Sequence, residues 1–185
     1  MAATPAVSVL MPVRNGERWL ELSLASIANQ TFRDFEFLIV DNGSTDRTPE
    51  IVARACAADS RFVALKEPIR GIVPALNTGL EAARAPLIAR LDADDMSRAD
   101  RLERQVEFMR QHPDVGLLGC WADVIDTHGR VYGQRRPLTE HEDLLRVLRF
   151  SNPFIHPAVV FRTDLVRARC RLYIGWYQNV LGGLE

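Results

Sequence analysis

Three carboxylates stand close together in the chain, at Asp92, Asp94 and Asp95. Like charges at this spacing repel one another unless a cation or solvent compensates them. Asp92 and Asp94 are two residues apart, so in an extended segment they project to the same side. Such oxygen ligands suit Mg²⁺ or Mn²⁺, which fills its remaining positions with phosphate oxygens and water. The pattern predicts a divalent-metal site, and a solvated acidic turn before the next helix is the structural alternative.

Two further polar segments could share a site with this acidic cluster. Pro12, Arg14, Asn15 and Glu17 follow the first apolar run of the chain, and Asp41 opens a polar loop after the second. Asp41 is placed like the acid that contacts a ribose or base edge in nucleotide-binding α/β folds. The sequence Asp-Asn-Gly-Ser is also suited to an Asx-turn, and the two roles are compatible.

Alternating strands and helices must position these segments. Apolar runs predict strands at Val7 to Met11, Phe35 to Val40, Phe62 to Leu65, Leu87 to Leu91 and Val115 to Trp121. Apolar residues at helical spacing predict helices between them, over Arg18 to Asn29, from Thr48, over Val73 to Arg84, and from about Leu102 to before Pro113. This order predicts an α/β fold whose mostly parallel sheet has helices on both faces. The polar segments then meet at the carboxyl edge of the sheet, where such folds bind ligands.

Local signals refine this pattern. Thr48 is expected to cap its helix with its hydroxyl, because Pro49 follows at the first helical position. The regular alternation ends after Trp121. A turn at 126–129 between two short strands, a helix over Glu140 to Phe150 and a strand over Ala158 to Phe161 are expected there.

Composition excludes several classes of protein. The chain has 185 residues, 47% of them hydrophobic, and a net charge of −1, which argues against a nucleic-acid binder with a strongly basic surface. No apolar run approaches the ~18 residues of a transmembrane helix, and the N-terminus does not have the pattern of a signal peptide. Cys56, Cys120 and Cys170 form no C-x-x-C motif, so we expect free thiols in a reducing cytoplasm. The sequence contains no G-x-G-x-x-G, P-loop or G-x-S-x-G motif. This argues against a Rossmann dehydrogenase, a P-loop enzyme and an α/β-hydrolase, respectively.

The segments VSVLMPVRNGERWL, LIVDNGSTDRT, LIARLDADD and NPFIHPAVVFR occur in an order that resembles family 2 inverting glycosyltransferases. The resemblance covers about Val7 to Arg162. It implies a Rossmann-like GT-A fold, a nucleotide-diphosphate sugar donor, expected to be a UDP-sugar, and Mg²⁺ or Mn²⁺. It also implies a saccharide or lipid-linked acceptor and, by analogy, a cytoplasmic protein working at the inner face of the membrane. We expect one domain over 1–185, with a nucleotide-binding half at 5–121 and a partial acceptor-side region at 122–185.

The resemblance also implies roles for particular residues. The residues expected to line the nucleotide pocket or contact the donor are Pro12, Arg14, Asn15, Glu17, Asp41 and Asp92. Asp92 and Asp94 match the DxD motif, and Asp94 is expected to be the direct metal ligand. His156 matches a family position near the active site, and packing as a structural histidine explains it equally well.

Three departures from the family pattern bear on activity. Asn42 replaces the second acid of the usual Asp-Asp-Gly-Ser, which removes one charge and keeps hydrogen bonding. Leu76 stands where Ala-Arg-Asn is common, and Arg70 is a candidate for the missing cation. The family takes its catalytic base from a Glu-Asp pair after the NPxxHP segment, but Glu142 and Asp143 precede that segment.

No catalytic base is therefore assigned, since Asp164 and Glu185 do not have the family context. A non-catalytic nucleotide-sugar-binding module is the main alternative to an active transferase, and a sugar nucleotidyltransferase is a weaker one. An apolar stretch from Leu172 to Leu181 predicts self-association, because exposed apolar patches favour partners or aggregation.

Overall fold

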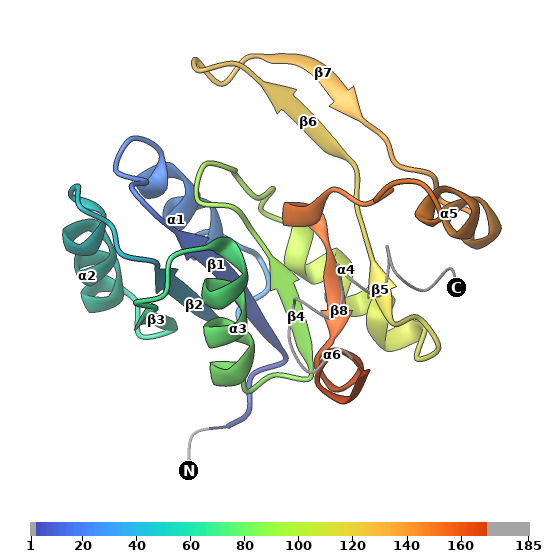
Figure 1. The fold of residues 1–185 in the computed structure, drawn as a ribbon, viewed down its shortest axis with the longest axis horizontal. Coiled ribbons are helices and arrows are strands. Elements are labelled where there is room, and N and C mark those ends of the chain that lie inside the picture. Colours follow the sequence, from blue (N-terminus) through green and yellow to red (C-terminus); the bar gives the residue numbers. More distant parts are fainter. Residues whose placement is uncertain (1–2, 170–185) are drawn as a thin grey trace.

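Six strands form the central sheet of the computed structural model, which describes residues 3–169 (Figure 1). In spatial order they are β3 (Phe62–Lys66), β2 (Phe35–Asp41), β1 (Val7–Val13), β4 (Leu87–Arg90), β8 (Val160–Arg162) and β5 (Leu117–Leu118). The helices are α1 (Leu20–Ala28), α2 (Thr48–Ala58), α3 (Ile72–Ala82), α4 (Arg101–Gln111), α5 (His141–Leu148) and α6 (Thr163–Arg169), with a 3-10 turn η1 (His156–Ala158). A separate ribbon pairs β6 (Ala122–Ile125) with β7 (Val131–Arg135).

Strand pairing confirms the predicted mostly parallel sheet. β1 pairs in parallel with β2 and β4, and β3 continues the parallel set beyond β2. Only β8 among the described strands of this sheet runs the other way, antiparallel to both β4 and β5. The predicted strand from Val115 to Trp121 is wrong in extent, because just Leu117–Leu118 pairs in the sheet. The chain then leaves the sheet, and Ala122–Ile125 pairs with β7 instead.

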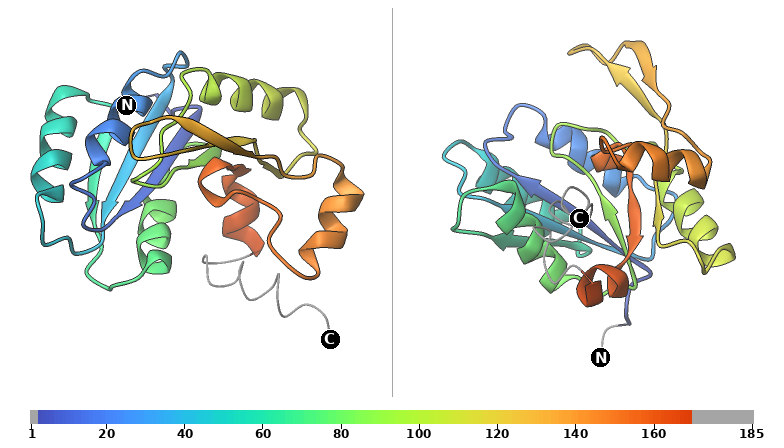
Figure 2. Two further views of the ribbon diagram at one scale, coloured as in Figure 1. Left: turned by 90° about the horizontal axis from the view of Figure 1, so that it is seen from above. Right: turned by 45° about the vertical axis from the view of Figure 1, so that its right-hand side comes forward.

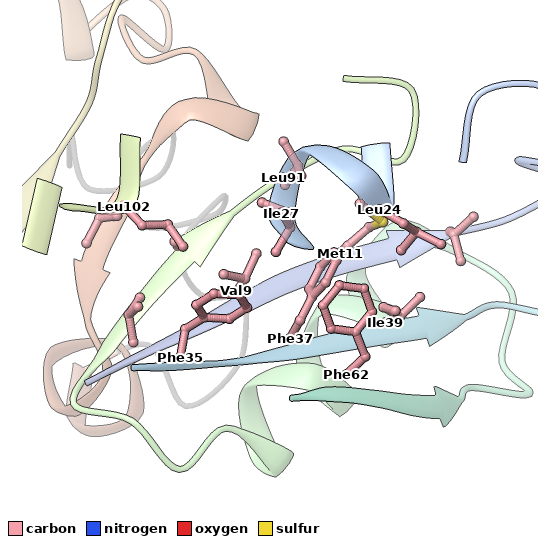
Figure 3. Packing of buried hydrophobic residues seen from close by; sticks show 14 of the residues in the cluster. Val9, Met11, Leu24, Ile27, Phe35, Phe37, Ile39, Phe62, Leu91 and Leu102 are labelled. Atoms are coloured by element: carbon pink, nitrogen blue, oxygen red, sulfur yellow. The ribbon is translucent and has the colours of Figure 1, made fainter. Parts of the chain in front are cut away.

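Helices cover both faces of the sheet (Figure 2), and an apolar layer lies between the sheet and the helices on each face. Successive side chains of a strand point to opposite faces, so Val9 and Phe37 lie in one cluster while Leu10 and Leu38 lie in the other. The first cluster takes residues from α1, α2 and α4, and the second takes residues from α3. In the first, shown in Figure 3, the rings of Phe37 and Phe62 meet edge-on at 4.9 Å between centroids. Because both faces of β1 and β2 are covered, the polar segments that follow these two strands lie at the carboxyl edge of the sheet.

The start of α2 differs from its predicted cap. Thr48 lies within the helix, and its Oγ1 accepts a hydrogen bond from the backbone N–H of Gly16 at 2.8 Å. The carboxylate of Asp46 instead accepts the backbone N–H of Thr48 at 3.0 Å. The predicted Thr48 cap is therefore wrong, because an acid two residues earlier takes the first helical N–H and the hydroxyl is used in a long-range contact.

The ribbon of β6 and β7 stands away from the sheet, and α5 follows it (Figure 1). Asp126 Oδ1 accepts the N–H groups of His128 at 2.8 Å and Arg130 at 3.0 Å, which confirms the predicted turn at 126–129. The helix expected over Glu140 to Phe150 is present as α5, and none of its residues is buried. This region therefore contributes little to the two apolar layers.

The described residues also bear on the expectations about thiols and membranes. Cys56 and Cys120 are free, as expected, and burial raises the pKa of each thiol. Between residues 3 and 169, no helix has the length and hydrophobicity needed to span a bilayer. Cys170 and the stretch from Leu172 to Leu181, on which the predicted self-association depends, lie outside the described residues.

Candidate functional site

A cavity of about 420 Å³ lies where β1, β2 and β4 end. Parallel strands bring their carboxyl ends to one edge of a sheet, so the loops that follow them converge there. The lining residues are Pro12, Val13, Arg14, Asn15, Gly16, Arg18, Trp19, Asn42, Gly71, Ile72, Ala75, Asp92, Ala93 and Asp94. The predicted site residues that are not part of this lining are Glu17, Asp41, Arg70 and His156.

A buried arginine holds the first carboxylate of the acidic cluster. Arg90 is fully buried in β4, and its Nη2 donates to Asp92 Oδ1 at 2.6 Å. Its Nη1 donates to the carbonyl oxygen of Leu91. Asp94 is exposed at the cavity and accepts no hydrogen bond from residues 3–169. Burial, with the negative charges of Asp92 and Asp94, raises the pKa of Asp95 to about 6. The three acids therefore have distinct surroundings despite their adjacency.

The chemistry of these acids fits a divalent cation that arrives with a ligand. In the described part of the chain, no three His, Cys, Asp or Glu side chains are grouped to hold a metal by themselves. Mg²⁺ commonly takes one or two protein carboxylates and completes its coordination with water and substrate phosphates. The unengaged carboxylate of Asp94, beside Asp92 at the cavity wall, matches that donor set. The cavity could thus hold a cation together with a phosphate group.

The loop after β1 is bonded to the loop after β2. Asn15 has a positive φ of 52°, its N–H donates to Ser44 Oγ at 3.0 Å, and its Oδ1 accepts the N–H of Thr45 at 2.8 Å. Glu17 Oε2 accepts the N–H of Arg47 at 3.1 Å. Asn15 and Glu17 are therefore both used to join the two loops, and Asn15 also lines the cavity.

The carboxylate of Asp41 stabilises the loop after β2. Its Oδ1 accepts the N–H of Ser44, three residues later, at 3.0 Å, whereas the predicted Asx-turn would bond the N–H two residues later. The hydroxyl of the same Ser44 accepts the N–H of Asn15, so this bond connects the loop after β2 to the loop after β1. The described geometry gives Asp41 a role in shaping the loop, and its contact with a base or ribose stays a prediction.

The segment between β3 and α3 forms one side of the cavity. Gly71 and Ile72 line it, whereas Arg70 is exposed just before them. Asn42 lines the cavity too, and its side chain bonds to the backbone of this segment. Leu76, at the position where the family often has arginine, is buried in the apolar layer under α3. The position that often carries a positive charge in the family therefore contributes only apolar packing here.

His156 lies in η1 and is electrostatically coupled to the acidic cluster. Burial lowers the pKa of His156 to about 4, and the positive charge of Arg90 adds to this, while the negative charge of Asp92 opposes it. The imidazole is thus neutral near physiological pH. The charges of Arg90 and Asp92 therefore act on a residue far along the chain, although His156 does not line the cavity.

Several lining residues were not predicted from the sequence. The guanidinium of Arg18 lies over the Trp19 ring at 4.6 Å from its centroid, and both residues line the cavity. Arg90, which holds the lining residue Asp92 from within the core, was also not predicted. The charge within the apolar run LIAR was a usable signal, because a buried charge requires a partner. Glu142 and Asp143 lie in the first turn of α5, as expected, and do not line the cavity.

Comparison with solved structures places the fold in the GT-A class. A structure described as S. aureus TarS 1-349 in complex with UDP matches with a TM-score of 0.68 and 24% identity, over 88% of this chain and 48% of that chain. A mannosyltransferase, PcManGT from Pyrobaculum calidifontis in complex with GDP-Man and Mn²⁺, matches with a TM-score of 0.66 and 25% identity, over 90% of this chain and 47% of that chain. The predicted GT-A fold is confirmed.

Sequence comparison then gives the family. Residues 8–167 match the family described as glycosyl transferase family 2, and the chain belongs to it. Amylovoran biosynthesis glycosyltransferase AmsE from Erwinia amylovora is 36% identical over 94% of this chain. O-antigen biosynthesis glycosyltransferase WbnJ from Escherichia coli is 29% identical over 94% of this chain. The chain spans 64% and 67% of the lengths of these two relatives.

Proposed function

We propose that this chain forms the donor-binding part of an inverting glycosyltransferase that uses a nucleotide-diphosphate sugar. The observation that carries the proposal is the open carboxylate of Asp94 at a cavity built from the ends of three parallel strands. PcManGT, with a similar fold, was solved with GDP-Man and Mn²⁺, and TarS was solved with UDP. A UDP-sugar and Mg²⁺ or Mn²⁺ are the proposed donor and cation.

The cation, when bound, would supply positive charge that stabilises the departing nucleoside diphosphate. Asp94 is the proposed direct ligand, and Asp92 is held by Arg90 so that at most one of its oxygens is available to the donor or the cation. Arg14 and Arg18 add positive charge to the lining, which favours an anionic ligand. Pro12, Asn15, Glu17, Asp41 and Arg70 are proposed to contact or frame the nucleotide.

The proposed acceptor is a saccharide or a lipid-linked saccharide. AmsE and WbnJ are named for the biosynthesis of amylovoran and of O-antigen. We place the protein in the cytoplasm at the inner face of the membrane on this analogy.

Calorimetric titration with UDP, in the presence and absence of Mn²⁺, tests the donor site. We expect Mn²⁺ to strengthen UDP binding by about tenfold or more, and Asp94→Ala to abolish this response because a methyl group cannot ligate a cation. Asp114→Ala is the matched control, since Asp114 is exposed and does not line the cavity. If the unmodified chain binds neither UDP nor GDP nor dTDP under either condition, the proposal is wrong.

A binding module without transfer activity is the second candidate, because no carboxylate of residues 3–169 has been assigned as the base. Glu142 and Asp143 lie in α5, and Asp164 lies in α6, away from the cavity lining. General-base assistance typically contributes ~10²–10⁴-fold to such a reaction. We expect slow hydrolysis of UDP-sugars and little acceptor-dependent transfer by this chain. Rapid transfer to a saccharide or lipid-linked acceptor would rule the second candidate out.

A further inference from the structure

The side chain of Asn42 is committed to the backbone between β3 and α3. Its Nδ2 donates to the carbonyl oxygens of Glu67 at 3.0 Å and Ile69 at 2.7 Å, and its Oδ1 accepts the N–H of Gly71 at 2.7 Å. Both amide hydrogens are therefore used, and the side chain is 4% exposed. Asn42 lines the cavity, but both hydrogens of its amide group are used in bonds to the protein backbone.

This pattern of bonds requires an amide. Two acceptors face Nδ2 and one donor faces Oδ1, so only an asparagine in this orientation satisfies all three. An ionised carboxylate has no hydrogen to donate and would place an oxygen against the carbonyl oxygen of Ile69. The acid that the family commonly has at this position could not make the same three bonds in this segment.

The segment that Asn42 holds is a wall of the cavity. Gly71 has a φ of 136°, and α3 begins at the next residue without a side-chain cap. Gly71, Ile72 and Ala75 line the cavity, and Ile72 is 54% exposed although it is apolar. Glu67, within this segment, also ties it to α3, because its Oε1 accepts the N–H of Ile69 at 2.7 Å and its Oε2 accepts the hydroxyl of Thr78. The position of this wall is thus set by side chains behind it.

We propose that Asn42 is a positioning residue for donor binding. It fixes the segment 67–71 so that Gly71 and Ile72 present a wall against which the nucleoside part of the donor packs, and Asn42 itself makes no contact through its amide hydrogens. This inference rests on the proposed function, since it names how one side of that same site is built. The metal-binding carboxylates belong to other loops, so the response to Mn²⁺ is independent of Asn42.

The test uses Asn42→Asp with two measurements. Hydrogen exchange should show the Gly71 N–H exchanging about tenfold faster at neutral pH. A carboxylate can still accept this N–H, but the two Nδ2 bonds to Glu67 and Ile69 that hold the segment are lost. UDP affinity should fall by about tenfold, while the ratio of affinities with and without Mn²⁺ stays as in the unmodified chain. Asn29→Asp is the matched control, since Asn29 is exposed at the end of α1 and its amide donates to the carbonyl oxygen of Ala25.

Thr78→Val provides a milder variant should Asn42→Asp fail to fold. It removes the hydroxyl bond to Glu67 and is expected to weaken UDP binding several-fold with the Mn²⁺ ratio again unchanged. Unchanged Gly71 exchange, or unchanged UDP affinity with faster exchange, overturns the role given to Asn42. An unmodified chain that binds no nucleotide instead overturns the proposed function, and the inference falls with it.

Discussion

At the scale of single residues, Arg90 connects the buried sheet to the candidate site. A fully buried guanidinium is costly unless its charge is paired, and here the partner is Asp92, two residues later, at the start of the turn that follows β4. The acidic cluster was singled out from residue type and spacing, and Asp92 and Asp94 line the cavity, while their role as metal ligands stays a prediction. Arg90 was not singled out, because its role depends on which side chains the packed helices leave beside β4.

Arg90→Met tests the value of this pair for stability. We expect the free energy of unfolding to fall by about 2–3 kcal/mol, because Asp92 loses its charged partner and the carbonyl oxygen of Leu91 loses a donor. Water limits this loss, since Asp92 is a third exposed. Urea denaturation followed by circular dichroism measures the change. Arg104→Met is the control, since its pair with Asp100 is exposed and should contribute no more than about 0.5 kcal/mol. Equal losses in the two variants would contradict the prediction.

At the scale of secondary-structure elements, the connection from α2 to β3 depends on an ion pair between Asp59 and Arg61, joined at 2.6 Å. The hydrogen bond from Arg61 lowers the pKa of Asp59, and burial opposes this less strongly. A lowered pKa means that the stabilisation is complete above the ordinary carboxyl pKa and is lost as the pH falls through the native value.

Asp59→Asn should therefore destabilise the protein by about 1–2 kcal/mol at neutral pH and by progressively less below about pH 4. Urea denaturation of both forms across this range measures the difference. Asp114→Asn, at an exposed site, should differ from the unmodified chain by less than about 0.5 kcal/mol. A difference for Asp59→Asn that does not shrink on acidification would show that charge is not its cause.

Helices and strands with strong apolar periodicity were predicted well, but the residues that pair with them or cap them were not. Helices α1 to α4 and strands β1 to β4 follow from the spacing of their apolar residues. The fifth predicted strand is present but shorter than expected, because an apolar run does not determine where strand pairing ends. The Thr48 cap was wrong because the helix already begins at Thr48, whose N–H is accepted by Asp46, while its hydroxyl accepts the N–H of Gly16 from the loop after β1.

At the scale of the whole molecule, the sheet is fixed at its two ends by different chemistry. Opposite the cavity edge, the buried Glu36 accepts the hydroxyl of Ser8 at 2.6 Å and the backbone N–H of Arg84 at 2.8 Å. These bonds join the starts of β1 and β2 to the segment before β4. Sequence reasoning did not find them, since they link residues distant in the chain and serve no recognisable motif.

The place of β8 has a consequence for how the protein is made. Val160 pairs with both Ala89 of β4 and Leu118 of β5, so a strand near the end of the described chain stands inside the sheet. During synthesis, the ribosome releases β4 long before it releases β8, and the edge of β4 waits with unpaired N–H and C=O groups. A chain halted after residue 155 should therefore aggregate, with light scattering and protease sensitivity well above those of the 185-residue chain. We therefore expect the nascent protein to bind chaperones during the interval between the release of β4 and that of β8.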